Sequence, residues 1–326
     1  MRFYNLKITP PSVGGLVNPP GTRVWTSNPD SYDPGALDIW FDVTTTAMHT
    51  PTGAYVVSIA GVPFHDLEGA NNFAGWSLTL VAGMTKRGLP LSTHQPAPTT
   101  IVEGTIFSNV GNWEGTEMSI NFVVLPSAYS QDHPGNLNLL WPKGKSLKPY
   151  LLLALQKAYP QYKVVVNLSV ELIADQDEPL YAHTLSGFAS QINDLTVNGK
   201  NHYPGVLIYI QNGQILCTDY NPNQVPIPLH YEDFIGQPTW VGGSQINIFV
   251  PLRGDIQAGK SITMPKDKVT NAPGIVSTQP NTSNAPFDFK KLFSGSFQVI
   301  STRHMGHFRG DSGKDWMTVI HAVAVS

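Results

Sequence analysis

The sequence predicts a mainly β protein with a small α/β insert. Three observations carry this prediction. Many apolar segments have the length of a strand, glycine (29) and proline (27) are dispersed between them, and only the middle of the chain shows helical periodicity. Short strands separated by Gly/Pro turns are typical of a β-barrel or a β-sandwich.

The first region, residues 1–127, is predicted to be a β domain. Its last strand shows the clearest period-two pattern, in which apolar Ile120, Phe122 and Val124 alternate with Ser119, Asn121 and Val123. The strands expected here cover residues 36–43, 54–60, 76–83, 100–107 and 117–124.

The middle region, residues 128–203, is predicted to be an α/β insert with two helices. Ser146 is a suitable N-cap for a helix over residues 147–159, and Pro160 would end it. A strand over residues 162–172 would follow. The second helix is expected over residues 180–195.

Three carboxylates, Asp175, Asp177 and Glu178, precede this second helix in the sequence. Negative charge at the start of a helix interacts favourably with the helix dipole. We favour this role over a pair of catalytic carboxylates for glycoside hydrolysis, which would have to face each other across a cleft.

The last region, residues 204–326, is predicted to be a second β domain. Asn212-Gly213 lies between two apolar runs, 206–210 and 214–218, and this is a strong signal for a β-hairpin. Residues 266–288 are rich in Pro, Asn, Thr and Ser and predict an exposed loop. The further strands are expected over residues 246–252, 261–264, 295–302 and 316–325.

The two β regions contain a weak internal repeat. A strand from Gly104 leads through a glycine-bearing turn and Trp113 to a strand ending at Val124. A strand from Gly295 leads in the same way through Trp316 to a strand ending at Val325. Duplicated β units within one chain suit a ring assembly, because each copy can occupy a similar position in a higher pseudo-symmetry.

Composition narrows the possible functions. Only 13% of the residues are charged, the net charge is −3, and no Lys/Arg run reaches four residues, so we expect no specific nucleic-acid binding. No apolar stretch is long enough to predict a membrane span or a secretory signal. With a single cysteine, Cys217, the chain can form no internal disulfide, which fits folding in a reducing cytosol.

The segment Gly310-Asp311-Ser312-Gly313 has the form found around the nucleophile of chymotrypsin-like proteases. That chemistry also needs a histidine base and an aspartate that orients it. Lys314 follows where those proteases have glycine, and only thirteen residues come after Gly313. A turn between two strands is therefore the favoured interpretation.

Several other motifs have a simpler structural explanation. His304, His307 and His321 lie near Asp311 and Asp315 in the sequence, but a metal site needs three or four converging ligands. Arg309-Gly310-Asp311 and Arg253-Gly254-Asp255 spell an adhesion tripeptide, which has little meaning without a signal peptide. We predict no catalytic, cofactor-binding or metal-binding residue and no enzymatic activity.

Seven tryptophans are spread along the chain, and both core packing and interface contacts would account for them. If several lay on one exposed face, the chain would suit a host-receptor or glycan-binding module, which is the alternative prediction. They are Trp25, Trp40, Trp76, Trp113, Trp141, Trp240 and Trp316.

Two parts of the sequence resemble phage tail baseplate hub proteins, the late-control protein D family. Residues 83–91 with 103–106, Asn112-Trp113-Glu114-Gly115-Thr116 and the strand up to Val124 look like the first tube-like barrel of these hubs. Residues 297–306, 308–312 and 316–318 are similar to the family's closing hairpin, and the helical insert lies where the family has one.

The resemblance implies two tube-like β-barrel domains that form a ring on trimerisation. It implies a structural virion protein, the central hub of a tail baseplate, that joins the tail tube to the tail spike and forms part of the channel for DNA. The expected partners are two further copies in a homotrimer, the tail spike protein, the tail tube protein, the tape-measure protein and other baseplate subunits. The expected location is the virion, after assembly in the host cytoplasm.

Overall fold

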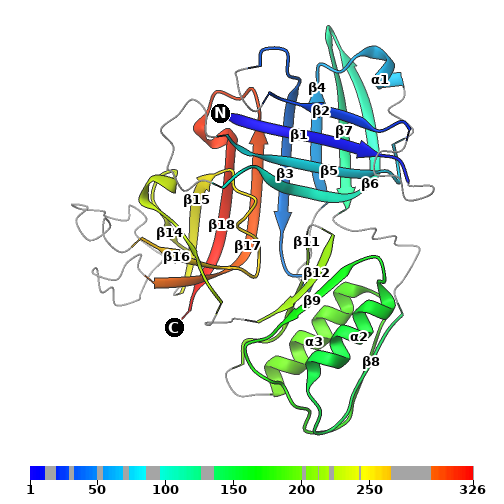
Figure 1. Cartoon of the computed structure of the whole chain (residues 1–326), viewed down its shortest axis with the longest axis vertical. Coiled ribbons are helices and arrows are strands. Elements are labelled where there is room, and N and C mark those ends of the chain that lie inside the picture. Colours follow the sequence, from blue (N-terminus) through cyan, green and yellow to red (C-terminus); the bar gives the residue numbers. More distant parts are fainter. Residues whose placement is uncertain are drawn as a thin grey trace.

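The computed structural model describes most of the chain and shows a mainly β protein with few helices (Figure 1). This confirms the coarse fold class predicted from the sequence. The described residues are 1–11, 20–28, 33–49, 54–68, 73–85, 96–125, 136–199, 203–211, 213–219, 224–241, 244–265 and 295–325. The predicted loop at 266–288 lies outside them.

Thirteen strands form one continuous sheet that bends through the upper part of the molecule in Figure 1. Its main path runs β14-β15-β18-β17-β3-β4-β7-β6-β5-β1-β2, with β16 also paired to β17, and β13 paired to β16. The first seven strands are β1 (Arg2–Thr9), β2 (Arg23–Thr26), β3 (Asp38–Thr45), β4 (Tyr55–Ala60), β5 (Ser77–Met84), β6 (Thr99–Glu114) and β7 (Glu117–Leu125). The others are β13 (Ile227–Pro228), β14 (Thr239–Trp240), β15 (Gln245–Pro251), β16 (Ser261–Met264), β17 (Gly295–His307) and β18 (Trp316–Ala324).

The sheet contains the same strand order twice. In the first half, β3, β4, β7, β6, β5 and β1 are consecutive neighbours. In the second half, β14, β15, β18, β17, β16 and β13 follow one another in the same order, and the strands also occur in the same order along the chain. One difference is that β1 pairs antiparallel with β5, whereas β13 pairs parallel with β16. The internal repeat expected from the sequence is confirmed and extends over six strands.

The two repeat tryptophans do not occupy equivalent places, contrary to the sequence comparison. Trp113 ends β6 and lies opposite Met118, whereas Trp316 begins β18 and lies opposite Gly306. In the repeat, Trp113 therefore takes the position of Gly306, and Met118 takes that of Trp316. Trp316 is buried, and Trp113 is 62% exposed.

The long strand β6 links two layers of the first half. Its beginning pairs with β5 and its end pairs with β7, and Figure 1 shows β1 and β5 crossing over β3, β4 and β7. A Cβ atom at Gly104 would lie 2.1 Å from the carbonyl oxygen of Leu125, so only glycine fits where β6 changes partner. The core between the layers includes Tyr4, Leu6, Phe41, Phe122 and Leu80.

The insert contains two of the three α-helices among the described residues. The helix α2 (Leu147–Ala158) confirms the first expected helix, with Leu151 and Leu155 on its buried face. The helix α3 (Leu185–Gly199) begins five residues later than expected. The short α1 (Phe64–Glu68) lies in the first half of the sheet.

The carboxylates expected before the second helix instead lie before and in β10 (Glu178–Ala182), which pairs with β8 (Leu137–Trp141). The carboxylate of Asp177 accepts a hydrogen bond of 2.8 Å from the backbone amide of Lys143. Asp177 thus fixes a turn next to β8, and the helix-dipole role predicted from the sequence is wrong.

The predicted hairpin is formed by β11 (Leu207–Gln211) and β12 (Gln214–Thr218), with Gln211 opposite Gln214. However, β12 pairs parallel with β9 (Lys163–Asn167) in a separate three-stranded sheet. The buried side chains of Ile215 and Cys217 pack in the core of the insert. The hairpin was expected in the second β region, because its parallel pairing with a strand some fifty residues earlier leaves no local signal in the sequence.

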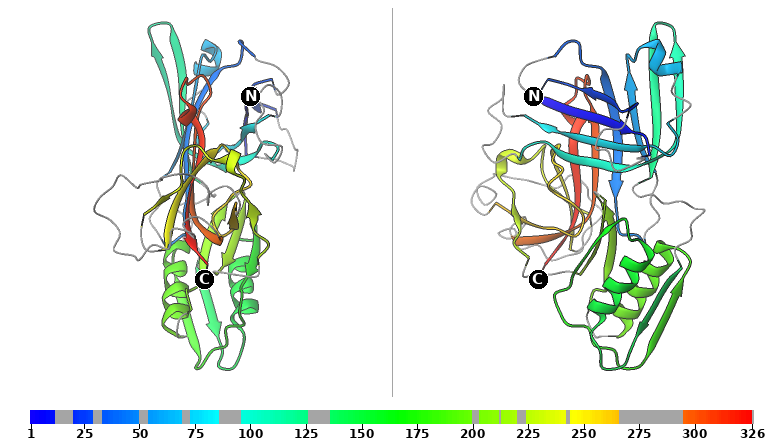
Figure 2. Two further views of the ribbon diagram at one scale, coloured as in Figure 1. Left: turned by 90° about the vertical axis from the view of Figure 1, so that its left-hand side faces the viewer. Right: turned by 45° about the vertical axis from the view of Figure 1, so that its right-hand side comes forward.

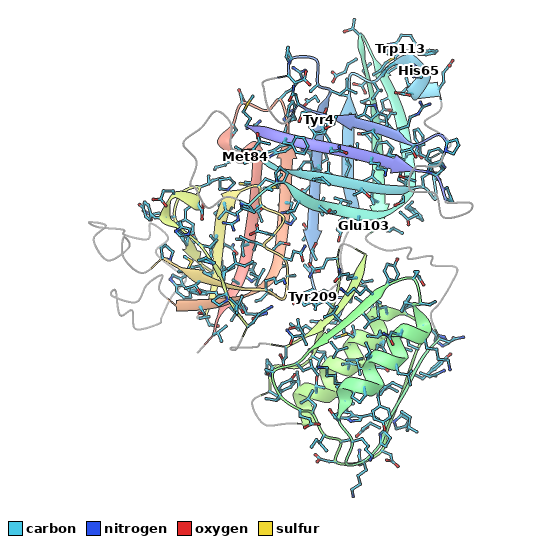
Figure 3. All side chains as sticks on the ribbon, in the orientation of Figure 1. Tyr4, His65, Met84, Glu103, Trp113 and Tyr209 are labelled. Atoms are coloured by element: carbon cyan, nitrogen blue, oxygen red, sulfur yellow. The ribbon has the colours of Figure 1, made fainter. Side chains whose placement is uncertain are left out.

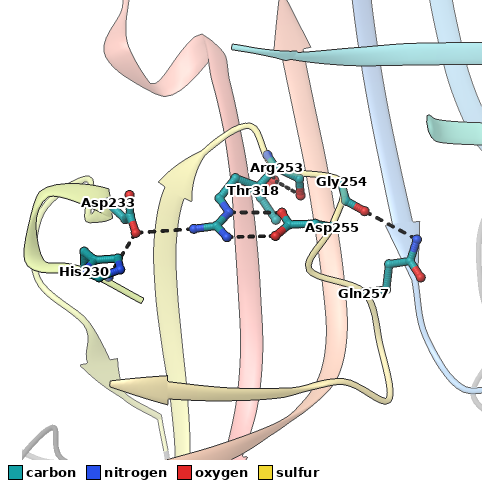
Figure 4. A network of polar contacts seen from close by, with 7 residues as sticks. All are labelled: His230, Asp233, Arg253, Gly254, Asp255, Gln257 and Thr318. Carbon is teal, nitrogen blue, oxygen red and sulfur yellow. Dashed lines mark hydrogen bonds and ion pairs between the residues drawn. The ribbon is translucent and has the colours of Figure 1, made fainter. Parts of the chain in front are cut away.

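The second half of the sheet has its own core, which includes Ile246, Ile248, Phe297 and Ile320. Next to it lies the buried Arg253, whose guanidinium donates to Asp255 at 2.8 and 3.1 Å and to Asp233 at 3.3 Å (Figure 4). The 3-10 turn Tyr231–Asp233 and the loop after β15 are joined through this arginine.

The described strands form no closed barrel, so the two tube-like β-barrel domains that form a ring on trimerisation stay a prediction. Instead, β17 pairs with β3 and joins the two halves into one open path that ends at β14 and β2. The division at residues 127 and 203 stays a prediction. Over the part of the chain that the structure describes, no helix is long and apolar enough to cross a membrane.

Candidate assembly surface

The hairpin of β6 and β7 reaches beyond the rest of the sheet and forms an arm (Figure 2). We call residues 107–120 the arm. Three of its large apolar side chains are exposed, namely Phe107, Val110 and Trp113. Apolar side chains gathered on a projecting element are typical of a surface that binds another protein.

The tip of the arm is held in place by α1. The rings of Phe64 and Trp113 meet edge-on with their centroids 5.6 Å apart. The carbonyl of Met118 accepts hydrogen bonds from the backbone amides of Gly61 and Val62. Figure 3 shows Trp113 at the end of the arm, next to His65 of α1. These contacts keep the arm's end close to α1 and fix its direction.

The face of the arm that carries Val110, opposite to the face that carries Trp113, continues across the sheet. Val110 lies opposite Asn121, Asn121 opposite Ser58, and Ser58 opposite Trp40. Residues directly opposite one another share a face, so these four form one row. Trp40 is 44% exposed, which shows that this face of the sheet is at least partly uncovered within the described chain.

A β-bulge sets the position of the arm's exposed residues. The register of β6 against β7 shifts between Ile106 and Ser108, so Phe107 is an extra residue. The register of β17 against β18 shifts in the same way around Ile300. A bulge bends its strand and increases the local twist, and both strands end seven residues after it, at Glu114 and His307.

The pairing of β17 with β3 shows how the two halves of the sheet join. Thr302 to His307 lie opposite Thr45 to Trp40. At this junction Arg303 forms an ion pair with Asp42, and hydrogen bonding to Asp42 raises the pKa of Arg303. His307 lies 2.9 Å from the carboxylate of Asp38.

Close packing completes the same junction. A Cβ atom at Gly306 would lie 2.2 Å from the ring of Phe41, which lies opposite in the register. Phe41 packs edge-on against Trp316, and the indole nitrogen of Trp316 donates to the carbonyl of Gly83 at 3.0 Å. Trp316 therefore connects the closing hairpin with the core of the first half.

The structure confirms that Ser312 lies in a turn. Its hydroxyl oxygen accepts a hydrogen bond from the amide of Lys314 at 3.1 Å, and its own amide donates to Asp315 at 2.7 Å. These contacts form a capping box on a 3-10 turn. Two backbone carbonyls nearby, those of Gly310 and Ser312, accept from Arg2.

The three histidines near this turn have different partners. His304 is buried 2.9 Å from the hydroxyl of Thr318, and burial lowers its pKa to about 4. His321 contacts Asn247 at 2.7 Å, and burial lowers its pKa as well. No three His, Cys, Asp or Glu side chains of the described residues are grouped closely enough to hold a metal ion.

The two adhesion-like tripeptides are held in structural contacts. Arg253 is 4% exposed and engaged with two aspartates, as described above. The guanidinium of Arg309 donates to the carbonyls of Pro34 and Ala36. Both arginine side chains therefore connect loops or turns with one another.

The tryptophans do not form a row on one face. Trp113 shares its face with Met118, and Trp40 shares its face with Asn121. Because Met118 and Asn121 are three residues apart on one strand, the two exposed tryptophans lie on opposite faces. Trp141 and Trp316 are buried. This arrangement does not favour the glycan-binding alternative.

Two of the three exposed apolar residues of the arm, Phe107 and Val110, could not be predicted from the sequence. Phe107 and Val110 lie in a strand whose inward and outward positions change at the bulge, and no residue type marks that change. The pairing of β17 with β3 joins positions about 260 residues apart, for which a single sequence carries no signal.

Comparison with known proteins shows which solved structures share this fold. No family model and no curated protein matches the sequence. Among solved structures, an E. coli protein described as a type VI secretion component with structural similarity to the T4 tail proteins gp27 and gp5 is 11% identical, with a TM-score of 0.51. The match covers 98% of this chain and 77% of that one.

A second match is the 43 kDa tail protein of prophage MuSo2 from Shewanella oneidensis, at 9% identity and a TM-score of 0.51. It covers 99% of this chain and 97% of that one. Over nearly its whole length, the chain therefore shares its fold with these two proteins. The likeness extends to the insert as well as to the sheet.

Proposed function

We propose that this chain is a structural subunit of a phage tail, the central hub of the baseplate. The observation that carries the proposal is the repeated strand order, which gives one chain two similar sheet units joined through β17 and β3. The tail-protein fold supports it.

In this proposal three copies form a ring of six sheet units. Within each chain, the β17–β3 pairing joins one unit to the next. Between chains, free strand edges of neighbouring copies would be joined in the same direction, because head-to-tail contacts form rings when the rotation closes. Closing the ring would complete the tube-like barrels that the single chain leaves open and would cover strand edges.

The ring would join the tail tube to the tail spike and would surround part of the channel for DNA. Its partners would be the spike, tube and tape-measure proteins and other baseplate subunits, and its place would be the virion after assembly in the host cytoplasm. With a net charge of −3, the chain would let DNA pass without binding it specifically. The regions 1–127 and 204–326 would be the two tube domains and 128–203 the insert, with the β11–β12 hairpin of the last region packed in the core of the insert.

The proposed role requires no enzymatic step. The residues singled out for protease or hydrolase chemistry, Ser312 and Asp177, are engaged in turn-forming contacts. The hub would act through geometry alone, by matching the symmetry of the tube to that of the spike.

Two measurements test the proposal. We expect light scattering and native mass spectrometry of the purified chain to give a trimer, and negative-stain images to show rings. We also expect antibodies against the chain to label tail particles at the end of the tube. A chain that stays monomeric at high concentration and is absent from tail particles would overturn the proposal.

A further inference from the structure

We propose that β6 of one copy pairs with β14 of the next, in the register that β17 and β3 use within the chain. This inference rests on the proposed ring and names the contact that closes it. In Figure 1 the arm and β14 lie at opposite ends of the sheet, as a head-to-tail contact requires.

The repeat identifies the two edges. Within the chain, the end of β17 pairs with β18 on one side and with β3 on the other. The corresponding end of β6 pairs with β7 on one side, while β5 reaches only as far as Thr105. In the second half, β14 takes the place of β3 and is the last strand of the path. Among the strands that the structure describes, the missing pair is thus β6 with β14.

The bulges fix the register on the arm. Val110 lies three residues after the bulge residue Phe107, and Arg303 lies three residues after Ile300. Val110 therefore corresponds to Arg303, whose partner in β3 is Thr44.

The strand ladders fix the register on β14. Ser108 and Ser301 each lie one residue beyond a bulge, and they face Val123 and His321, respectively. Val123 therefore corresponds to His321. Their partners in the next strands, Val56 and Asn247, then correspond as well.

The next step of the ladder reaches β14. Asp42 lies opposite Val56, and Thr239 lies opposite Asn247. Thr239 thus corresponds to Asp42, and Val241, two residues further on, corresponds to Thr44. Since Thr44 faces Arg303, Val241 of one copy should face Val110 of the other.

The side chains at these positions suit each other. Val110 is 56% exposed and Val241 is 51% exposed, so both offer apolar surface to a partner. Asn112 would lie opposite Thr239, which is a pair of small polar side chains that can share a hydrogen bond. Pro238 precedes β14 and cannot donate, so the backbone contribution is short and side-chain burial must add to it.

A disulfide tests the register directly. The amide of Phe308 donates to the carbonyl of Ile39, so hydrogen-bonded pairs alternate from there and Thr44–Arg303 is a non-hydrogen-bonded pair. Cα atoms in such pairs are about 4.5 Å apart, within the range that a disulfide spans. The native Cys217 is buried and does not compete.

We expect a chain carrying both Val110→Cys and Val241→Cys to form covalent dimers and trimers on mild oxidation. An equimolar mixture of the two single variants should give covalent dimers as the largest species that uses this pair. A chain with Val110→Cys and Thr239→Cys is the matched control, because a diagonal pair is roughly 7–8 Å apart and should cross-link far less. Thr44→Cys with Arg303→Cys should form the disulfide within one chain.

The outcomes separate the pairing from the ring. Trimers by light scattering without the Val110–Val241 cross-link would overturn the pairing and leave the proposed hub intact. A chain that never trimerises would overturn both. As a second measurement, Val110→Lys should weaken trimerisation at least tenfold and Val241→Glu in the same chain should restore it; a Val110→Lys chain that trimerises normally would also contradict the pairing.

Discussion

A buried arginine with two aspartate partners helps to hold the second half of the sheet together. Arg253 appears in the sequence as part of an adhesion-like tripeptide, yet its guanidinium lies between Asp233 and Asp255 beneath the surface. A buried charge is tolerated only when it is paired and hydrogen-bonded. The sequence shows all three residues but gives no sign of their contact.

Replacing Arg253 with Met should destabilise the protein strongly. The change leaves Asp233, which is fully buried, without its cation, and breaking a buried pair in this way costs about 3–5 kcal/mol. Denaturant unfolding would measure the loss, and adding Asp233→Asn should recover part of it. Arg303→Met is the control, because the half-exposed pair with Asp42 should contribute less than about 1 kcal/mol. Equal losses for both arginines would contradict the prediction.

His304 should make the stability depend on pH between about 6.5 and 4. Burial lowers its pKa to about 4 in the folded state, although Asp255 acts in the opposite direction. Below pH 6.5 the unfolded chain therefore binds a proton that the folded chain does not, so stability falls as the pH falls. The loss from this group should reach at most about 3 kcal/mol near pH 4.

Comparison with His304→Asn isolates this effect from that of the carboxylates. Asparagine keeps a polar atom near Thr318 but does not titrate, so the unfolding free energy of the variant should decrease less from pH 7 to pH 4. Parallel curves for the two proteins would show that His304 does not contribute.

At the scale of elements, the sequence was informative where signals are local. The alternation of Ile120, Phe122 and Val124 predicted β7, and Ser146 and Pro160 bracketed α2. The pairing of β12 with β9 and of β17 with β3 was not predictable, because both are long-range and depend on side chains that fit only in three dimensions. The bulge at Phe107 lies in a local hairpin, but no residue type marks it, so it was not predicted and neither was the exposed face of the arm.

The junction of β17 with β3 should be sensitive to one methyl group. Gly306→Ala places a Cβ about where the ring of Phe41 now lies, and overpacking of this kind costs about 1–3 kcal/mol. Phe41→Leu shortens the opposing side chain and should cost stability by itself. Together the two changes should cost less than the sum of the single losses, as measured by denaturant unfolding. Strict additivity would show that the two residues do not contact each other.

At the scale of the whole molecule, the repeat gives the strongest link between fold and function. Six strands recur in the same order, and among the described residues the pairing of β17 with β3 has no counterpart between β6 and β14. The sequence suggested duplication from two tryptophans that turned out to occupy different positions. What the duplication preserves is the strand order and the bulge, while the side chains have diverged to suit a junction within the chain or one between chains.

That divergence predicts how the trimer should respond to salt. The junction within the chain carries Arg303 and Asp42, whereas the corresponding positions at the proposed contact are Val110 and Thr239, which are uncharged. Salt screens exposed charge pairs but does not weaken apolar contacts. The dissociation constant of the trimer, measured by sedimentation, should therefore change less than about threefold between 50 and 500 mM NaCl.

The chain in which a charge pair replaces the two valines, Val110→Lys with Val241→Glu, is the control for that measurement. It should assemble at low salt and weaken as salt is added, because its contact then depends on an ion pair at a solvated edge. If the unmodified trimer loses tenfold or more of its affinity over the same range, charged groups close the ring. The apolar contact between Val110 and Val241 would then have to be abandoned.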